Sequence, residues 1–204
     1  TGDIETTAGT IDVEATAGFI AMSDTATTTS TSGNIRYEAG TTLTLGAITT
    51  GANVSLIADT IRDSGTDDID ISAVELRVET TDAAGAFGES SNHIETSVTT
   101  LSANVGTSGV FISESTDITI DTVEDTDNLA DGITVNRVLD TGLVTASIVN
   151  DASQSDLITS GALVLQTLDG SITTVATNGD ISVNGNVLLQ TQGSGKDIDL
   201  NADL

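Results

Sequence analysis

The chain has 204 residues, and its 31 Asp and Glu against 5 Lys and Arg give a formal net charge of −26. So few cations exclude the basic patch with which proteins bind nucleic acid, and the negative charge disfavours an anionic membrane surface. The absence of Cys excludes disulfides, thiolate nucleophiles and Cys-ligated metals. No apolar run approaches the ~18 residues of a spanning helix, so we expect no membrane span.

A short unit recurs along the first half of the chain: usually a Gly, Asn or Asp, then two aliphatic residues with one residue between them. It occurs at residues 2–4, 9–13, 18–22, 33–37, 52–56, 68–71 and 117–120. Alternation at period two places the aliphatic side chains on one face of a strand and Thr, Ser, Asp or Arg on the other. The preceding Gly, Asn or Asp tolerates positive φ and turns the chain. Each unit therefore predicts a short β-strand.

The same unit returns in the second half, at residues 132–135, 161–165, 170–172, 179–183 and 185–189. The strands are too short and too alike for a sandwich, whereas three such strands with three turns make one solenoid coil of about 20 residues. We therefore predict an all-β β-solenoid that runs through residues 1–204, with a longer loop at about 80–95. Because both chain ends fall within the pattern, we expect a segment of a longer repeat protein.

The most specific pattern lies at residues 61–114. It contains strand-like units at residues 69–71, 73–78, 94–103 and 109–114, with Gly85-Ala86-Phe87-Gly88 among them. Together with the Gly-Asn-Ile and Gly-Asp-Ile turns at Gly33 and Gly179, this succession resembles the repeats of filamentous-haemagglutinin-like bacterial surface proteins. The resemblance implies a right-handed parallel β-helix that is exported to the bacterial cell surface or beyond, where such proteins form fibres or adhesins.

The expected partners follow from the fold and from the resemblance. A solenoid without polar caps exposes unpaired strand edges at both ends. We therefore expect further repeats of the same chain or head-to-tail copies at these ends. The resemblance adds a receptor or glycan on a host or neighbouring cell.

His93 is the only histidine of the chain, and Ser90, Ser91 and Asn92 directly precede it. A hydrolytic site needs a nucleophile, a base and an orienting acid in one place, and no nucleophile-elbow motif accompanies this histidine. We therefore expect a solvated loop histidine. We also expect no catalytic or cofactor-binding residue, and a protein that is not an enzyme.

A carbohydrate-active β-helix, either a lyase or a hydrolase, is the alternative. A lyase needs clustered cations to neutralise a uronate, whereas the five cations lie far apart in the sequence, at Arg36, Arg62, Arg77, Arg137 and Lys196. A hydrolase could use two of the many carboxylates, but sugar clefts usually present aromatic platforms, and the chain has three Phe and one Tyr. A further alternative is an ice-binding solenoid, for which the Thr-x-Thr units are too irregular.

An acidic stretch near the middle of the chain contains the candidate calcium ligands. Asp125, Asp127 and Asp131 lie there, together with Asp121 and Glu124. Calcium binds six to eight oxygens, but neither the EF-hand spacing nor the Gly-Gly-x-Gly-x-Asp repeat occurs here. We therefore expect a solvated acidic turn and no firm cofactor, with calcium as the metal to test.

Overall fold

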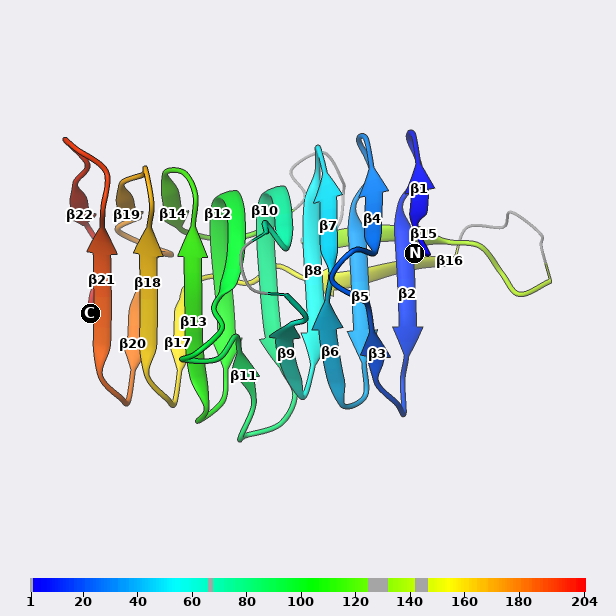
Figure 1. The fold of residues 1–204 in the computed structure, drawn as a ribbon, viewed down its shortest axis with the longest axis horizontal. Helices are drawn as coiled ribbons and strands as arrows, with labels where there is room; N and C mark the ends of the chain where they lie inside the picture. Colours follow the sequence, from blue (N-terminus) through cyan, green and yellow to red (C-terminus); the bar gives the residue numbers. More distant parts are fainter. Residues whose placement is uncertain (1, 66–67, 125–131, 142–146) are drawn as a thin grey trace.

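The computed structural model describes residues 2–65, 68–124, 132–141 and 147–204. Within these residues the regular elements are β-strands, and no helix occurs that is long and apolar enough to cross a membrane. Twenty strands belong to one large sheet in which the paired strands are parallel, while two further strands form a separate antiparallel pair (Figure 1). The predicted all-β class is therefore confirmed.

The parallel strands are arranged in three stacks, and the chain visits the stacks in turn. The first stack begins with β1 (Ile4–Thr6), β4 (Thr27–Ser30), β7 (Ala47–Thr50) and the starts of the long strands β10 (Ile71–Thr80) and β12 (Ile94–Val105). It continues from the middle of β12, where Thr100 and Leu101 pair with β14 (Ile118–Ile120), through β19 (Ile172–Thr174) and β22 (Ile198–Leu200). The second stack contains β2 (Ile11–Ala15), β5 (Ile35–Ala39), β8 (Asn53–Ala58), the long strands β10 and β12 again, β17 (Leu157–Thr159) and β20 (Ile181–Val183). The third stack contains β3 (Ile20–Ala21), β6 (Thr42–Leu45), β9 (Thr60–Asp63), β11 (Ala86–Phe87), β13 (Gly109–Glu114), β18 (Leu163–Thr167) and β21 (Val187–Thr191).

Three successive strands, one in each stack, form what we call a coil; the first coil is β1–β3 and the last is β20–β22. Partners in neighbouring coils lie 18 residues apart for Leu43 and Ile61, and 26 residues apart for Ile172 and Ile198. This repeated return to the same three stacks is compatible with a β-solenoid. The predicted spacing of about 20 residues lies within the observed range.

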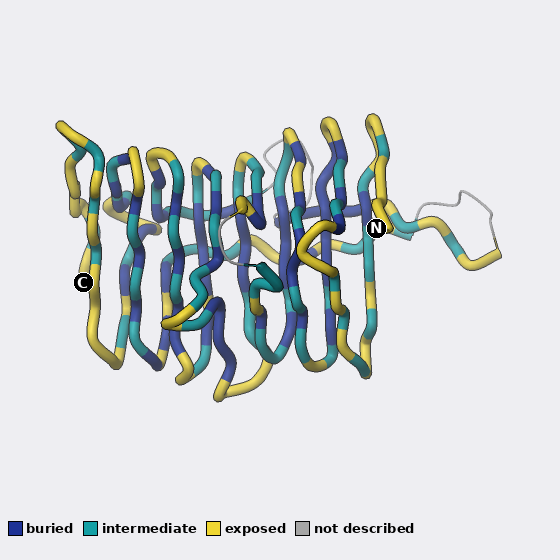
Figure 2. Tube along the Cα trace, viewed as in Figure 1, coloured by how far each residue is buried: buried dark blue, intermediate teal, exposed yellow. Residues whose placement is uncertain are grey.

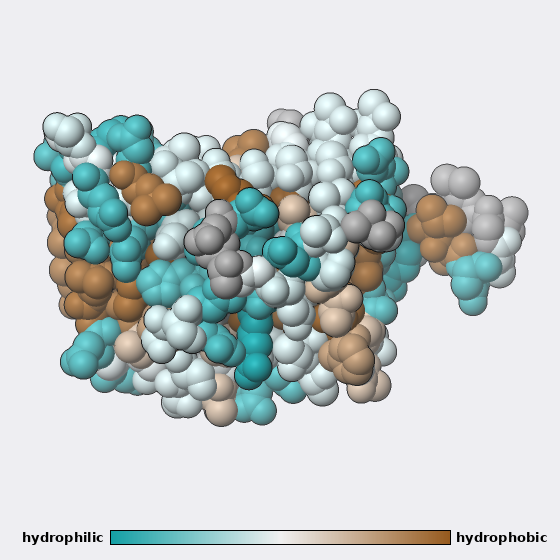
Figure 3. All heavy atoms as spheres, viewed as in Figure 1, coloured by the Kyte–Doolittle hydropathy of each residue, from teal (hydrophilic) through white to brown (hydrophobic). Residues whose placement is uncertain are grey.

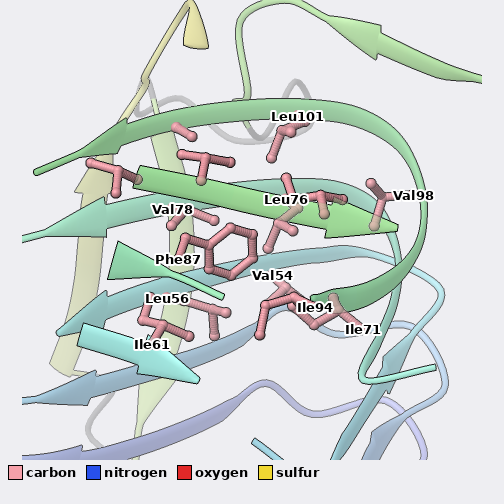
Figure 4. Packing of buried hydrophobic residues seen from close by; sticks show 14 of the residues in the cluster. Val54, Leu56, Ile61, Ile71, Leu76, Val78, Phe87, Ile94, Val98 and Leu101 are labelled. Atoms are coloured by element: carbon pink, nitrogen blue, oxygen red, sulfur yellow. The ribbon is translucent and has the colours of Figure 1, made fainter. Parts of the chain in front are cut away.

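The core consists of inward-facing aliphatic residues that repeat from coil to coil. Leu43, Ile61, Phe87, Val110 and Leu163 are consecutive partners in the third stack, and each is fully buried. Figure 2 shows the buried positions recurring along the length of the molecule, and Figure 4 shows the aliphatic side chains packed around Phe87. Removal of such side chains from water is the main stabilising contribution of a β core.

Apolar residues become exposed in the last coil. Val187, Leu188, Ile198 and Leu200 are each 40–49% exposed, and Figure 3 shows apolar side chains gathered at this end of the molecule. Within the described residues, each of β20, β21 and β22 pairs with a parallel neighbour on one side. This end therefore presents both strand edges and apolar surface.

The antiparallel pair, which we call the hairpin, consists of β15 (Gly132–Arg137) and β16 (Ser147–Ala152). The strand predicted at residues 132–135 is therefore present, but it pairs with β16 and not with the parallel strands of the stacks. Period-two alternation marks any strand with one buried face and does not specify which sheet the strand joins. The long departure from the stacks lies between β14 and β17, whereas the segment expected as a loop at 80–95 contains β11 of the third stack.

Candidate functional site

The hairpin covers a row of polar side chains on the outer face of the second stack. Arg36, Ser55, Arg77 and Ser102 are consecutive register partners in β5, β8, β10 and β12, and each is at most 6% exposed. Arg77 donates from Nε to the backbone oxygen of Ala152 in β16, at 3.0 Å. Because residues of this kind are rarely buried unless they are paired, the hairpin is an integral second layer.

Arg36 lies at the centre of an ion-pair network between this layer and the stack. Its guanidinium contacts Asp151 of β16 at 2.9 Å, Asp12 at 3.2 Å and Glu14 at 2.7 Å, and it also contacts Glu38. Burial alone would lower the pKa of Arg36, but the contacts with Glu38, Asp151 and Asp12 raise it above its ordinary value. Arg36 is therefore held charged between the two layers.

Arg137 extends this network from β15 of the hairpin to the first coil. Its Nε lies 2.6 Å from Asp12 Oδ2, and its guanidinium also contacts Glu14. Arg36 and Arg137, far apart in the sequence, thus share the same two carboxylates. Their separation in the sequence gave no sign of this contact, because only the hairpin brings the two cations together.

The edge of β15 that does not pair with β16 forms hydrogen bonds with side chains at the corners of successive coils. Asn34 donates from Nδ2 to the oxygen of Thr134, at 2.9 Å. One coil earlier, Thr10 Oγ1 accepts from the N–H of Asn136 at 2.7 Å and lies 3.1 Å from its oxygen. Alternate residues of β15 are therefore bonded by consecutive coils, and the strand runs along the stack of coils.

A carboxyl cluster lies near the start of β10, where Asp70 directly precedes the strand. Oxygen atoms of Asp63, Asp70 and Glu95 all lie within 4.8 Å of one another. Asp70 is buried and accepts from the N–H of Glu95 at 3.0 Å, while Asn92 Nδ2 donates to Asp63 at 2.9 Å. Burial, reinforced by the hydrogen bond with Asp63, raises the pKa of Asp70 to about 9.

This cluster has two chemical possibilities. Asp70 can remain protonated and donate its proton to Asp63, which relieves the repulsion between the buried Asp70 carboxylate and its partly buried neighbour. A cation such as calcium can instead bind carboxylate oxygens, but it needs six to eight ligands and would have to displace the Asp70 proton. The raised pKa favours the shared proton. Sequence reasoning missed this cluster because its members come from three separate segments.

The loop between β11 and β12 brings the predicted His93 segment next to this cluster. The His93 ring lies 6.0 Å from the Phe111 ring, and its Nδ1 lies 3.4 Å from Ser113 Oγ. His93 is therefore half-buried against Phe111, whereas we expected a solvated loop histidine. This burial lowers the pKa of His93. In the part of the chain that the structure describes, Ser113 provides the hydroxyl bonded to this ring, rather than Ser90 or Ser91.

Beside Phe111, the same loop borders an open hollow of about 340 Å³. Arg62 and Glu89 face each other in this hollow at 3.1 Å, and both are about half exposed. Phe111 and Ser90 line other parts of it. The hollow thus combines one aromatic ring with one exposed ion pair.

A recurrent bond links neighbouring coils along the whole molecule. A carboxylate or amide directly before a strand accepts the N–H of the equivalent residue in the following coil. The acceptor and donor pairs are Asp3 and Thr27, Asn34 and Asn53, Asp70 and Glu95, Asp117 and Ser171, Asp156 and Asp180, and Asp180 and Asp203, at 2.7–3.1 Å. In the Gly-Asp-Ile and Gly-Asn-Ile turns, Asp and Asn therefore join coils as well as turning the chain.

The predicted calcium candidates Asp125, Asp127 and Asp131 lie outside the described residues. Of their described neighbours, Asp121 accepts from the adjacent N–H of Thr122 at 2.7 Å, and the Glu124 N–H donates to a carboxylate of β10 at 3.1 Å. These contacts are local or made to the stack and do not form a common ligand set.

Comparison with family models, with curated proteins and with solved structures finds no match for this chain. The function proposed below therefore rests on the geometry of the stacks, the hairpin, the ion-pair network and the hollow beside Phe111.

Proposed function

We propose that the chain is a segment of a right-handed parallel β-helix that serves as a structural and adhesive rod outside a bacterial cell. The observation that carries this proposal is the continuous stacking of three sets of parallel strands along one direction. Each coil contacts mainly its neighbours, so length can be extended by adding coils without redesigning the core. A rod made in this way provides distance, stiffness and a repeated surface.

Two further features support a rod in an extracellular setting. The coil-to-coil bonds of Asp and Asn lie at the same positions in successive coils, which resists separation of coils along the axis. The net charge of −26 keeps neighbouring rods apart and soluble, and salt screens this repulsion. The bacterial surface location is proposed from the resemblance of residues 61–114 to filamentous-haemagglutinin-like repeats.

Electron microscopy of the native protein on its source cells, with an antibody raised against this segment, tests the proposal. We expect labelled thin fibres outside the cells, with the ~4.8 Å axial spacing of stacked strands in their diffraction. Label confined to the cell interior, or on short capped particles, would overturn the rod.

The hollow beside Phe111 favours a carbohydrate-binding function as the second candidate, because it pairs an aromatic ring with Arg62 and Glu89. Calorimetric titration with neutral and uronate-containing oligosaccharides tests it directly. Saturable binding that Phe111→Ala weakens at least tenfold, while Val74→Ala does not, would support this candidate. No heat of binding at millimolar oligosaccharide would remove it.

A further inference from the structure

Arg36 and Arg77 occupy equivalent places beneath the hairpin. Each donates from Nε to β16, where the acceptors are the adjacent residues Asp151 and Ala152. Each also contacts, through Nη2, the glutamate two residues further along its own strand. The two side chains are similarly buried, at 5% and 8% exposed. The two guanidinium groups are therefore held in the same orientation by the same kinds of contact.

The remaining nitrogen, Nη1, distinguishes the two arginines. Nη1 of Arg36 contacts Asp12 at 3.2 Å and Glu14 at 2.7 Å, both in the preceding strand of the second stack. Nη1 of Arg77 is buried and has no hydrogen-bond partner within the part of the chain that the structure describes. A guanidinium N–H that is removed from water without an acceptor is costly. Nη1 of Arg77 therefore needs an acceptor that the described side chains do not provide.

The register of the strands identifies the side chains on this side of Arg77. One coil before Arg77, the positions of Asp12 and Glu14 are taken by Ser55 and Ile57 of β8. Ser55 is fully buried, and among the described residues its Oγ also has no hydrogen-bond partner. Because neighbouring strands lie ~4.8 Å apart, two donors without an acceptor stand side by side where the earlier coil has two carboxylates.

The ratio of carboxylates to cations indicates the charge of the missing acceptor. Arg36 and Arg137 together contact four carboxylates, which is two for each cation. Within the described residues, Arg77 forms an ion pair with one carboxylate, that of Glu79. One monovalent anion would give Arg77 the same ratio of two to one.

We propose that a small monovalent anion of the halide class, with chloride as the abundant example, binds beneath the hairpin and accepts from Arg77 Nη1 and Ser55 Oγ. Both groups are buried, so the site admits a small ion and excludes a large one. The ion takes the part at Arg77 that Asp12 and Glu14 take at Arg36, and it stabilises the contact between the hairpin and the stack. This binding site goes beyond the rod function and does not depend on it.

Urea denaturation in two sodium salts of equal ionic strength tests the site. A ligand that binds only the folded chain raises its stability as the ligand concentration rises. We expect the urea midpoint to increase between about 10 mM and about 0.5 M sodium chloride beyond the increase seen with sodium gluconate, whose anion is too large for the site. Equal midpoints in the two salts would overturn the proposal.

A matched pair of variants locates the ion. Ser55→Asp supplies a carboxylate at the position that Asp12 holds beside Arg36, so the difference between chloride and gluconate should disappear. Ser182→Asp adds the same charge at an exposed position of the same stack and should keep the full difference. A Ser55→Asp protein that still distinguishes the two salts would place the ion elsewhere and overturn the site.

Anomalous diffraction identifies the bound species directly. The protein is refolded from urea in sodium bromide and crystallised, because bromide resembles chloride and scatters anomalously. We expect an anomalous peak within hydrogen-bond distance of both Arg77 Nη1 and Ser55 Oγ. Density there without an anomalous signal would identify a water molecule and overturn the anion. Fibres on source cells would support the rod function whichever result is obtained.

Discussion

The second stack contains two regions that are built from the same kind of strand but differ in their outer face. The hairpin covers this face in one region, which we call the covered region, and leaves it exposed in the other, the bare region. In β5, the outward Arg36 is 4% exposed beneath the hairpin, whereas in β17 the outward Ile158 is 40% exposed. The covered region has acquired a buried ionic layer, and the bare region presents apolar and small polar side chains to solvent. Backbone geometry alone therefore does not decide which face of a coil becomes interior; the inserted hairpin decides it.

The two regions also depend on different interactions. The covered region needs its charges to remain paired, because an unpaired buried charge is strongly destabilising. The bare region depends on neutral packing and on carboxylates that accept N–H groups from the next coil. Mutations in one region should therefore respond differently from equivalent mutations in the other.

The largest expected effect is in the covered region. Arg36→Ala leaves Glu38 and the buried Asp151 without their cation, while Asp12 keeps Arg137, and we expect a loss of about 3–5 kcal/mol in unfolding free energy. Urea denaturation measures this loss, and hydrogen exchange should show β15 and β16 losing protection first. The control Arg62→Ala removes an exposed ion pair and should change stability by at most about 1 kcal/mol. Equal losses in the two variants would contradict a buried network.

The next largest effect is expected at Glu114, the last residue of β13 in the third stack. Glu114 is fully buried, and its two oxygens accept from Thr96 Oγ1 at 2.7 Å, the Val98 N–H at 3.1 Å, and both the N–H and hydroxyl of Thr116 at 2.8 Å. Glu114→Gln turns one acceptor into a donor that faces other donors, and we expect a loss of about 2–3 kcal/mol. Thermal unfolding should show Glu89→Gln, at an exposed site, within about 0.5 kcal/mol of the unmodified protein.

A smaller effect is expected in the bare region. Asp156 accepts the N–H of Asp180 at 3.0 Å and has a φ of 71°, a conformation that Asn and Asp tolerate better than most residues. Asp156→Ala should lose about 1–2 kcal/mol through the lost hydrogen bond and the strained backbone. Asp156→Asn keeps both the acceptor and the conformational tolerance, so urea denaturation should show a markedly smaller loss. A loss as large as that of the alanine variant would refute this explanation.

The last effect is expected from the carboxyl cluster and depends on pH. The folded chain keeps the Asp70 proton up to about pH 9, whereas the unfolded chain releases it near the ordinary value of 3.8. The unfolded state thus binds fewer protons between these values, and this residue makes folding less favourable as pH rises through that range. Asp70→Asn stays neutral, so its Tm relative to the unmodified protein should rise steadily from pH 5 to pH 8. A difference that does not change with pH would exclude a protonated Asp70.

Local pattern was sufficient to predict most of the short strands and which side chains of each strand are buried. Ile35, Val54 and Leu76 stand at alternating positions in their strands and are fully buried partners of one another. Their environment follows from period two and from the turn residue before each strand. The segment at 132–135 has the same pattern but belongs to the hairpin, because alternation describes a buried face and carries no information about the partner strand.

The polar sites were beyond local pattern for a related reason. Asp63, Asp70 and Glu95 meet only because coils of different length bring the end of β9 beside the starts of β10 and β12. The Arg36 and Asp151 contact likewise depends on where the hairpin folds back. Regular repeats make short-range neighbours predictable, whereas insertions create contacts whose register no repeat encodes.

The bond between each Asp or Asn and the following coil also has a consequence in time. Asp3 needs the N–H of Thr27, and Asp156 needs that of Asp180, so in both cases the bond is completed by a residue that emerges 24 positions later from the ribosome. The hairpin contacts differ, because Thr10 must wait for Asn136. The first coils can thus form one after another during synthesis, whereas the layer that covers them closes only after most of the 204 residues have been made.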